Sequence, residues 1–199
     1  MKYALTCIIV ALCLSSAVQA AEPYGGKFNS FTFSIGGYWP HADLEGEGYK
    51  SGGNFAATYM RAFHDWFGFG CGTHTYVSQS KKKTADIGDG DFSAMGIEMM
   101  LFAQPNHWRI QPYIGLGPAL YFNFIAYEDD TDHDDVEESG AGFGGVLKAG
   151  VRVFVTDRFF SGMSVKFFSN RWNLDIDENR DKTYDFGGGV LAFELGFTF

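Results

Sequence analysis

The sequence predicts an all-β fold, an eight-stranded antiparallel up-and-down transmembrane β-barrel. Apolar and polar residues alternate in eight segments, several of which are longer than the usual strand of a soluble protein. Long polar connections alternate along the chain with short turns. Beyond residue 20, no segment has the roughly 18 consecutive apolar residues of a membrane-spanning helix. A chain that spans a bilayer without helices must close its sheet, because lipid cannot satisfy open backbone groups.

The first 20 residues have the features of a secretory signal peptide. Lys2 supplies a positive charge, residues 4–14 form a short apolar core, and Val18-Gln19-Ala20 resembles a cleavage site. We therefore expect residues 1–20 to be removed and residues 21–199 to fold as one barrel domain. Cys71 is then the one remaining cysteine, so an internal disulfide cannot hold this secreted domain together.

The strands are predicted from a period of two residues. Large apolar side chains are expected to face lipid, and the small, polar or charged residues between them to face the interior. The strands cover residues 28–40, 53–63, 67–78, 91–103, 109–125, 141–155, 159–171 and 182–199. The outward set includes Phe31, Phe33 and Ile35, then Met95, Ile97, Met99 and Leu101, then Ile114, Leu116, Leu120 and Phe122, and finally Leu147, Val151 and Val153.

The connections assign the two ends of the barrel. Long loops are predicted at residues 41–52, 79–90, 127–140 and 172–181, and short turns at residues 64–66, 104–108 and 156–158. Bacterial barrels place long loops outside the cell and short turns, with both termini, in the periplasm. Aromatic residues near the strand ends, including Tyr38 and Trp172 on the loop side, are expected to form interfacial girdles.

Six titratable residues fall on the inward face near the middle of their strands. Eight strands enclose a lumen that side chains can fill, and an isolated charge there would be costly. We expect these residues to pair across the lumen. Our interpretation is a salt-bridged plug, and the alternative is a gated narrow pore. The six residues of this expected lumen charge network are His74, Glu98, Lys148, Arg152, Lys166 and Glu194.

Acidic residues gather in the third and fourth loops. Every second residue there is acidic in places, which resembles the opening of an EF-hand loop, but the required glycine and the closing glutamate are missing. A weak surface site for calcium or magnesium is therefore an expectation, and a solvated acidic loop is the alternative. The candidate ligands are Asp130, Asp132, Asp134, Asp175, Asp177 and Asp181.

The charge of the chain excludes one class of partner. The full chain has a net charge of −9, and loss of Lys2 with the signal peptide makes it −10. Such a protein repels the phosphate backbone, so we expect no nucleic-acid binding.

The terminal strand and two internal segments resemble a known family. Residues 112–117 read Pro-Tyr-Ile-Gly-Leu-Gly, residues 142–158 cover a predicted strand and the third short turn, and residues 193–199 form an amphipathic terminal strand. Together they resemble the OmpA/OmpX/OmpW-like outer membrane protein beta-barrel domains, or porin-family small barrels. The resemblance implies the outer membrane of a Gram-negative cell, contact with its lipid and lipopolysaccharide, and insertion by the barrel-assembly machinery. It also implies an assembly signal, formed by Phe193, Leu195, Phe197 and Phe199.

One enzyme class of similar shape can be tested by its motif. Lipid A deacylases of this shape carry His-x-Ser-Asn on a late strand, and the matching stretch here is Phe167-Phe168-Ser169-Asn170. Phe167 replaces the histidine, so no imidazole is present in the motif to activate the Ser169 hydroxyl. We therefore expect no catalytic residues and no cofactor.

These observations favour a non-enzymatic integral outer-membrane protein. We expect it to contribute to envelope integrity or to surface interaction such as adhesion, through a host or surface ligand that the sequence does not identify. A narrow channel for small solutes is the first alternative. A lipid A-modifying hydrolase is the second, and the substitution at Phe167 disfavours it.

Overall fold

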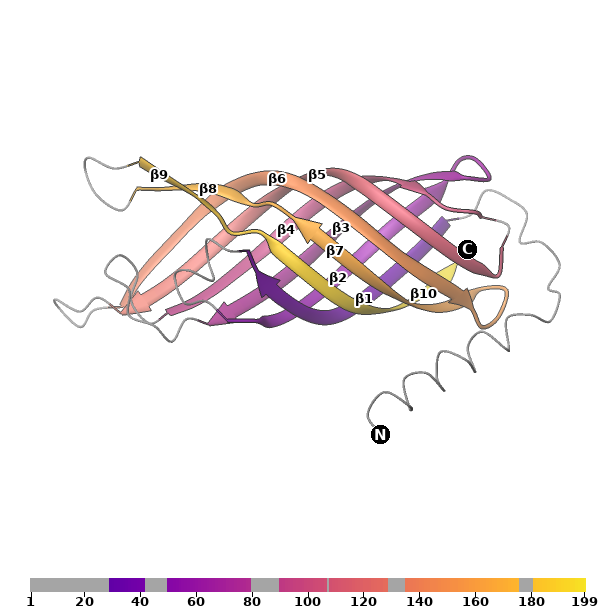
Figure 1. Ribbon diagram of the computed structural model, residues 1–199, viewed down its shortest axis with the longest axis horizontal. Coiled ribbons are helices and arrows are strands. Elements are labelled where there is room, and N and C mark those ends of the chain that lie inside the picture. The colour runs from indigo at the N-terminus through magenta and orange to yellow at the C-terminus, as the bar shows by residue number, and fades with distance from the viewer. Residues whose placement is uncertain (1–28, 42–49, 80–89, 107, 129–134, 176–180) are drawn as a thin grey trace, which may run out of the picture.

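The computed structural model describes residues 29–41, 50–79, 90–106, 108–128, 135–175 and 181–199. The predicted signal peptide lies outside these residues and stays a prediction. Within the described part of the chain, no helix has the length and apolar character that crossing a bilayer requires. Ten strands form one antiparallel sheet (Figure 1): β1 Asn29–Pro40, β2 Gly52–Ala62, β3 Phe67–Gln79, β4 Gly90–Ala103, β5 Ile110–Glu128, β6 Asp135–Phe154, β7 Phe159–Phe168, β8 Arg171–Asp175, β9 Asp181–Asp185 and β10 Gly188–Thr198.

Eight of these strands close into a barrel. Each of β1 to β6 pairs with the next strand in sequence, β7 pairs with β10, and β10 returns to pair with β1. The closing seam runs from Ser30–Thr198 to Pro40–Gly188. It is extended by two backbone hydrogen bonds between Asn29 and Phe199, of 2.9 and 3.1 Å. The predicted eight-stranded antiparallel barrel is therefore confirmed.

The two ends of the barrel differ. The β2–β3, β4–β5 and β6–β7 connections lie at the same end as the C-terminus, on the right in Figure 1, and we call this the turn end. Strands β1, β3, β5 and β8 end at the opposite end of the barrel, which we call the loop end. This arrangement follows from antiparallel neighbours in an up-and-down sheet.

Several predicted boundaries at the loop end were wrong. The β5–β6 ladder continues as far as Glu128–Asp135, so most of the predicted third loop is strand. The predicted fourth loop likewise contains residues 172–175 of β8 and Asp181, the first residue of β9. A strand shows alternating apolar and polar residues only where one of its faces contacts lipid. Strand segments that extend past the lipid-contacting region have two polar faces, so the alternation does not predict them.

A break divides each of the last two predicted strands. β7 is separated from β8 by Ser169-Asn170, and β9 from β10 by Phe186-Gly187. At these two breaks, backbone N–H groups still have hydrogen-bond acceptors. The N–H groups of Asn170 and Gly187 both donate to Oδ1 of Asp185 at 2.9 Å, and the N–H of Phe186 donates to the carbonyl of Asn170 at 2.8 Å.

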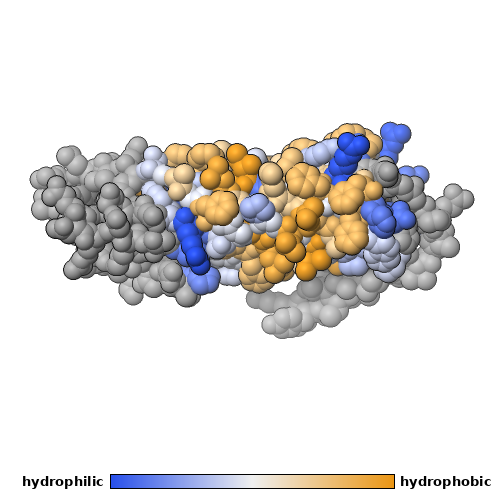
Figure 2. All heavy atoms as spheres, turned by 90° about the horizontal axis from the view of Figure 1, so that it is seen from above, coloured by the Kyte–Doolittle hydropathy of each residue, from blue (hydrophilic) through white to orange (hydrophobic). Residues whose placement is uncertain are grey.

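The outside of the barrel is apolar. Residues that the alternation places outward, such as Ile35, Leu101 and Leu116, are 58–66% exposed. Figure 2 shows that hydrophobic residues dominate the middle of the face in view, with hydrophilic ones nearer the two ends. This belt is the surface that a bilayer covers.

The core of the fold is inside the barrel, where aromatic rings pack against glycines. A Cβ atom added to Gly70 or Gly115 would lie 2.7 or 2.5 Å from the ring of Phe102. A Cβ atom on Gly196 would lie 2.2 Å from the ring of Phe160. Small residues on one strand thus make room for large ones on another, which is how a narrow barrel is filled.

Deletion of Phe199 should impair folding of the barrel. The variant loses both backbone hydrogen bonds to Asn29, each worth about 0.5–1.5 kcal/mol. We expect a smaller fraction of the unboiled sample to migrate as the compact folded band on a denaturing gel. Phe199→Leu keeps the backbone bonds and should fold more fully. Equal folded fractions for the wild type and the deletion would show that the seam does not need this residue.

Candidate functional site in the barrel lumen

The six titratable residues predicted to face inward all lie in the lumen. Their side chains are between 0 and 4% exposed. They come from five strands: His74 from β3, Glu98 from β4, Lys148 and Arg152 from β6, Lys166 from β7 and Glu194 from β10. The structure arranges them in two groups, each centred on one carboxylate.

The first group is centred on Glu194. Its Oε1 atom accepts hydrogen bonds from Nζ of Lys148 and from the hydroxyl of Tyr113, both at 2.7 Å. Its Oε2 atom lies 3.5 Å from Nε of Arg152. The guanidinium also stacks over the Tyr113 ring, 4.4 Å from its centroid, and Nη1 donates to Oε1 of Gln104 at 3.4 Å. These contacts tie β10 to β5 and β6 across the interior.

The second group is centred on Glu98. Its Oε2 atom lies 3.2 Å from Nδ1 of His74 and 3.5 Å from Nζ of Lys166. Lys148 of the first group and Lys166 of the second are cross-strand partners on β6 and β7, so the two groups lie side by side in one network. The network links strands on opposite sides of the barrel. Charges buried in this way require such partners, because an unpaired one would be strongly destabilising.

An aromatic layer lies between this network and the loop end. Phe168 is central, with ring centroids 4.9 Å from Tyr76, 5.8 Å from Tyr121 and 6.0 Å from Tyr38. The hydroxyls of Tyr76 and Tyr38 donate at 3.2 Å to the carbonyls of Phe186 and Gly187. These two carbonyls belong to the break between β9 and β10, so the aromatic layer also holds the break in place.

A polar cap closes the lumen at the turn end. Gln104, Asn106 and Gln111 are 1–2% exposed and turn inward from the β4–β5 connection and the start of β5. Gln104 donates to the side chain of Asn106, which donates to the carbonyl of His64 at 2.6 Å. Gln111 donates to the carbonyl of Trp108 at 3.0 Å. The lumen therefore has three layers in order: polar cap, charge network and aromatic layer.

A closed eight-stranded wall with an apolar outside and a filled polar interior has the form of a small bacterial barrel. The sequence matches the family described as "Outer membrane protein beta-barrel domain" over residues 7–199. The chain belongs to this family. No curated protein sequence matches it significantly.

Solved structures of other outer membrane barrels share this fold. OprG from Pseudomonas aeruginosa is 17% identical, with 89% of this chain and 99% of that chain covered and a TM-score of 0.58. Ail, the attachment invasion locus protein of Yersinia pestis, was solved in complex with the heparin analogue sucrose octasulfate. It is 15% identical, with coverages of 88% and 100% and a TM-score of 0.56. Neisserial surface protein A is 15% identical, with coverages of 88% and 100% and a TM-score of 0.51. At these identities the likeness shows the fold alone.

Two predicted members of the interfacial girdle in this outer membrane barrel are not at the interface. Tyr38 is 0% exposed and Trp172 is 7% exposed, because both side chains point into the lumen as part of the aromatic layer. The alternation of inward and outward residues along β1 already indicated the correct position of Tyr38. Tyr38 is two residues beyond the inward-facing Gly36, so the period of two already placed it inside. The prediction gave the aromatic type of the residue more weight than its position.

The predicted assembly signal lies on the outer face of β10. Phe193, Leu195, Phe197 and Phe199 are 37–66% exposed. Phe197 contacts rings on both neighbouring strands, at 6.1 Å from Phe31 and 6.4 Å from Phe159. A docking factor approaching from outside the barrel could reach all four side chains. Their role in assembly stays a prediction.

The predicted acidic cation site is described only in part. Asp130, Asp132, Asp134 and Asp177 lie outside the described residues. Asp175 and Asp181 are cross-strand partners at the ends of β8 and β9. In the described ranges, no group of three or more His, Cys, Asp and Glu side chains is placed to hold a metal ion. Calcium or magnesium binding by the loops stays a prediction.

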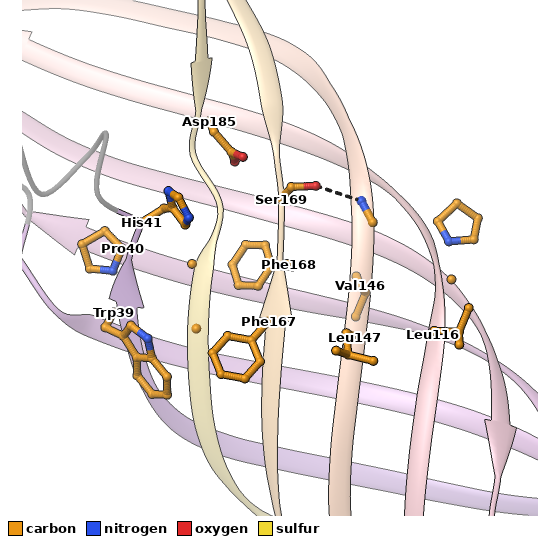
Figure 3. Close-up of a pocket in the computed structure, with 15 residues that line it drawn as sticks. Trp39, Pro40, His41, Leu116, Val146, Leu147, Phe167, Phe168, Ser169 and Asp185 are labelled. Carbon is orange, nitrogen blue, oxygen red and sulfur yellow. Dashed lines mark hydrogen bonds between the residues drawn. The ribbon is translucent and has the colours of Figure 1, made fainter.

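Ser169 has a structural partner on the outer wall. Its hydroxyl accepts a hydrogen bond from the N–H of Gly145 at 3.1 Å, and its own N–H donates to the Gly145 carbonyl at 3.0 Å. Figure 3 shows the hydroxyl directed toward β6 and away from His41. Among the described residues, no imidazole forms a hydrogen bond with Ser169, and a serine nucleophile needs such a base.

Glu194→Ala should destabilise the folded barrel without preventing insertion. It leaves Lys148 and Arg152 buried without their carboxylate, which costs about 3–5 kcal/mol. We expect a lower urea midpoint for unfolding from lipid vesicles. The double variant Glu194→Gln, Lys148→Met also removes one of the two unpaired cations. Its free energy of unfolding should therefore lie between those of Glu194→Ala and the wild type. Asp91→Ala, at an exposed position, is the control, with an effect within about 0.5 kcal/mol. A Glu194→Ala variant as stable as this control would contradict the proposed network.

Proposed function

We propose that this outer membrane β-barrel is a non-enzymatic scaffold. Its plugged barrel strengthens the envelope and presents the loops for interaction at the cell surface. One observation carries the proposal: the lumen is filled by side chains that contact one another across it. Glu194 connects to β5 and β6, and Glu98 to β3 and β7. A wall braced from inside is rigid, and rigid walls are suited to holding variable loops.

We propose further that the loop end is extracellular and that both termini are periplasmic. The connections at residues 41–51 and 80–89 are longer than any connection at the turn end, and the β5–β6 ladder extends to Glu128–Asp135 at the loop end; both support this orientation. The apolar belt then contacts outer-membrane lipid, and the strand extensions of β5 and β6 project toward lipopolysaccharide. The barrel-assembly machinery, on the periplasmic side, would meet the four outward residues of β10. Their exposure on the seam strand supports that assignment.

The charge of the third loop suggests the kind of surface partner. Residues 128–138 contain eight acidic residues and no lysine or arginine. Such a segment attracts cations or basic surfaces and repels polyanions. Ail was solved with a polysulfated ligand, and the acidic third loop makes a ligand of that kind a poor expectation for this chain. We therefore favour a partner that is positively charged or bridged by divalent cations.

A narrow channel is the second candidate, and specific atoms favour it. In the described part of the lumen, three buried cationic side chains face two carboxylates. Nη2 of Arg152, Oε1 of Glu98 and Oε1 of Gln111 are buried without a hydrogen-bond partner. Unsatisfied polar atoms of this kind suit contact with water. A thin wet path past the network would make the barrel weakly conducting.

Single-channel conductance distinguishes a plugged barrel from a narrow channel. Wild-type protein in a planar bilayer should show no stable single-channel steps, because the network fills the lumen. The double variant Glu98→Ala, Lys166→Ala removes two long side chains from the middle of the lumen and should produce small steps. Cys71→Ala changes an exposed residue on the outer face and should behave as the wild type. Stable steps in the wild type that change with Glu98 or Lys166 would establish the channel instead.

Replacement of the acidic loop should abolish surface attachment. Cells that display the barrel are expected to attach to a cultured epithelial monolayer better than cells without it. Exchange of residues 129–134 for six glycine and serine residues removes four aspartates and should reduce attachment to the background. The same exchange at residues 81–86 is the matched control. Wild-type attachment equal to that of cells lacking the protein would overturn the surface-interaction proposal.

A further inference from the structure

An open groove lies on the outside of the barrel wall near the loop end. It crosses the region where β1, β10, β7, β6 and β5 run side by side, and it has a volume of about 830 Å³. Figure 3 shows Trp39 on one side of the groove, Phe167 in the middle, and Leu147 and Leu116 on the other. The groove is separate from the lumen charge network.

Two glycines give the groove its shape. Gly145 is an exposed position on β6, and a Cβ atom added there would have no atom nearer than the Gly117 carbonyl oxygen at 3.8 Å. Its outer side is therefore open space between the side chains of Phe143 and Leu147. Gly189 has the opposite role: a Cβ atom there would lie 2.1 Å from the indole of Trp39. The indole therefore lies directly over β10 and forms one wall of the groove.

The floor of the groove is closed. Val146 and Phe168, which line it from beneath, are only 4% and 6% exposed. Behind Gly145 the wall is sealed by the two hydrogen bonds between Gly145 and Ser169. The groove therefore opens toward the membrane and does not lead into the lumen.

The groove has an apolar end and a polar end. Leu116, Leu147 and Phe167 line the end nearer the middle of the wall, and each is 45–59% exposed. His41 is exposed toward the loop end, where its N–H donates to the Gly187 carbonyl at 2.9 Å. Arg171 is also exposed and is the cross-strand partner of Asp185, which lines the groove; it lines a second, smaller hollow of about 400 Å³ with Leu120 and Phe143. Asp185 also lines this end, but its Oδ1 atom is occupied by the N–H groups of Asn170 and Gly187. A ligand that fits this gradient has a long hydrocarbon chain and an anionic group near His41 and Arg171.

We propose that the groove binds lipid A, the membrane anchor of lipopolysaccharide. One acyl chain lies between Trp39 and Leu147, and a phosphate is held by His41 and Arg171. The inference rests on the orientation proposed above, because the polar end then lies at the outer leaflet. An acyl chain in the groove points toward the middle of the bilayer, as chains of that leaflet must. The open side of Gly145 supplies the space, and phosphate is a natural partner of guanidinium and imidazole donors.

Native mass spectrometry of the refolded barrel with purified bisphosphorylated lipid A tests the site. We expect wild-type protein to keep one lipid A molecule after excess lipid is removed. Gly145→Trp places an indole in the groove and should lower the retained fraction about ten-fold, which corresponds to ~1.4 kcal/mol. Gly53→Trp is the matched control: Gly53 is an exposed position on β2, where a Cβ atom meets only the Val77 Cγ2 atom at 3.9 Å. Both variants must show the folded band on a denaturing gel.

Further arms of the experiment test the phosphate contact and the chemistry. The double variant His41→Gln, Arg171→Gln should lose affinity for bisphosphorylated lipid A but not for the dephosphorylated form. No retained lipid A in the wild type, or equal loss in Gly145→Trp and Gly53→Trp, would overturn the site. Preferential retention of phosphatidylethanolamine would also overturn it. Loss of an acyl chain that depends on Ser169 would show a hydrolase instead. Because these measurements use purified protein, they are independent of the attachment assay.

Discussion

The structure depends on one constraint: a sheet in hydrocarbon must pair all its backbone groups. Here β10 meets β1 along eleven register pairs, and this seam turns a ladder of hairpins into a closed wall. A wall of eight strands encloses only a narrow space. Every second side chain of every strand must then share that space. The buried residues are consequently mostly small, polar or aromatic, with a few charges, and each charge in the lumen must find a partner there.

In the charge network, two carboxylates supply the partners that the buried cations need. Glu194 has three donors and Glu98 has two close partners, and the cross-strand pair Lys148–Lys166 places the two groups side by side. The aromatic layer solves a second problem of the same kind. The strands break at Phe186-Gly187, and the hydroxyls of Tyr38 and Tyr76 satisfy the two carbonyls released there. The neighbouring break at Ser169-Asn170 lies beside the groove on the outer wall, where Ser169 and Gly145 form two hydrogen bonds.

The period-two pattern was sufficient to predict the barrel, its strand order and the inward placement of residues such as Glu98 and Lys166. It could not predict their partners, because pairing across a lumen depends on barrel shear and on rotamers. It also missed the strand break, since Ser169-Asn170 and Phe186-Gly187 differ little from their surroundings in sequence. Tyr38 was assigned to an interfacial girdle on its residue type, although its position indicated the interior. The groove at Gly145 could not be predicted from the sequence. An outward glycine leaves open space only if side chains on the adjacent strands do not fill it, and the sequence does not show which side chains those are.

The side chains that fill the lumen close it and shield its ion pairs from water. Hydrogen exchange of arginine side chains, followed by NMR in lipid nanodiscs, measures this shielding. Arg152 is 1% exposed in the network, whereas Arg158 is exposed on the β6–β7 turn. A closed lumen predicts that the Nε–H of Arg152 exchanges about a hundred-fold or more slowly than that of Arg158. Comparable exchange rates at the two residues would show that water reaches the network freely and would contradict the account.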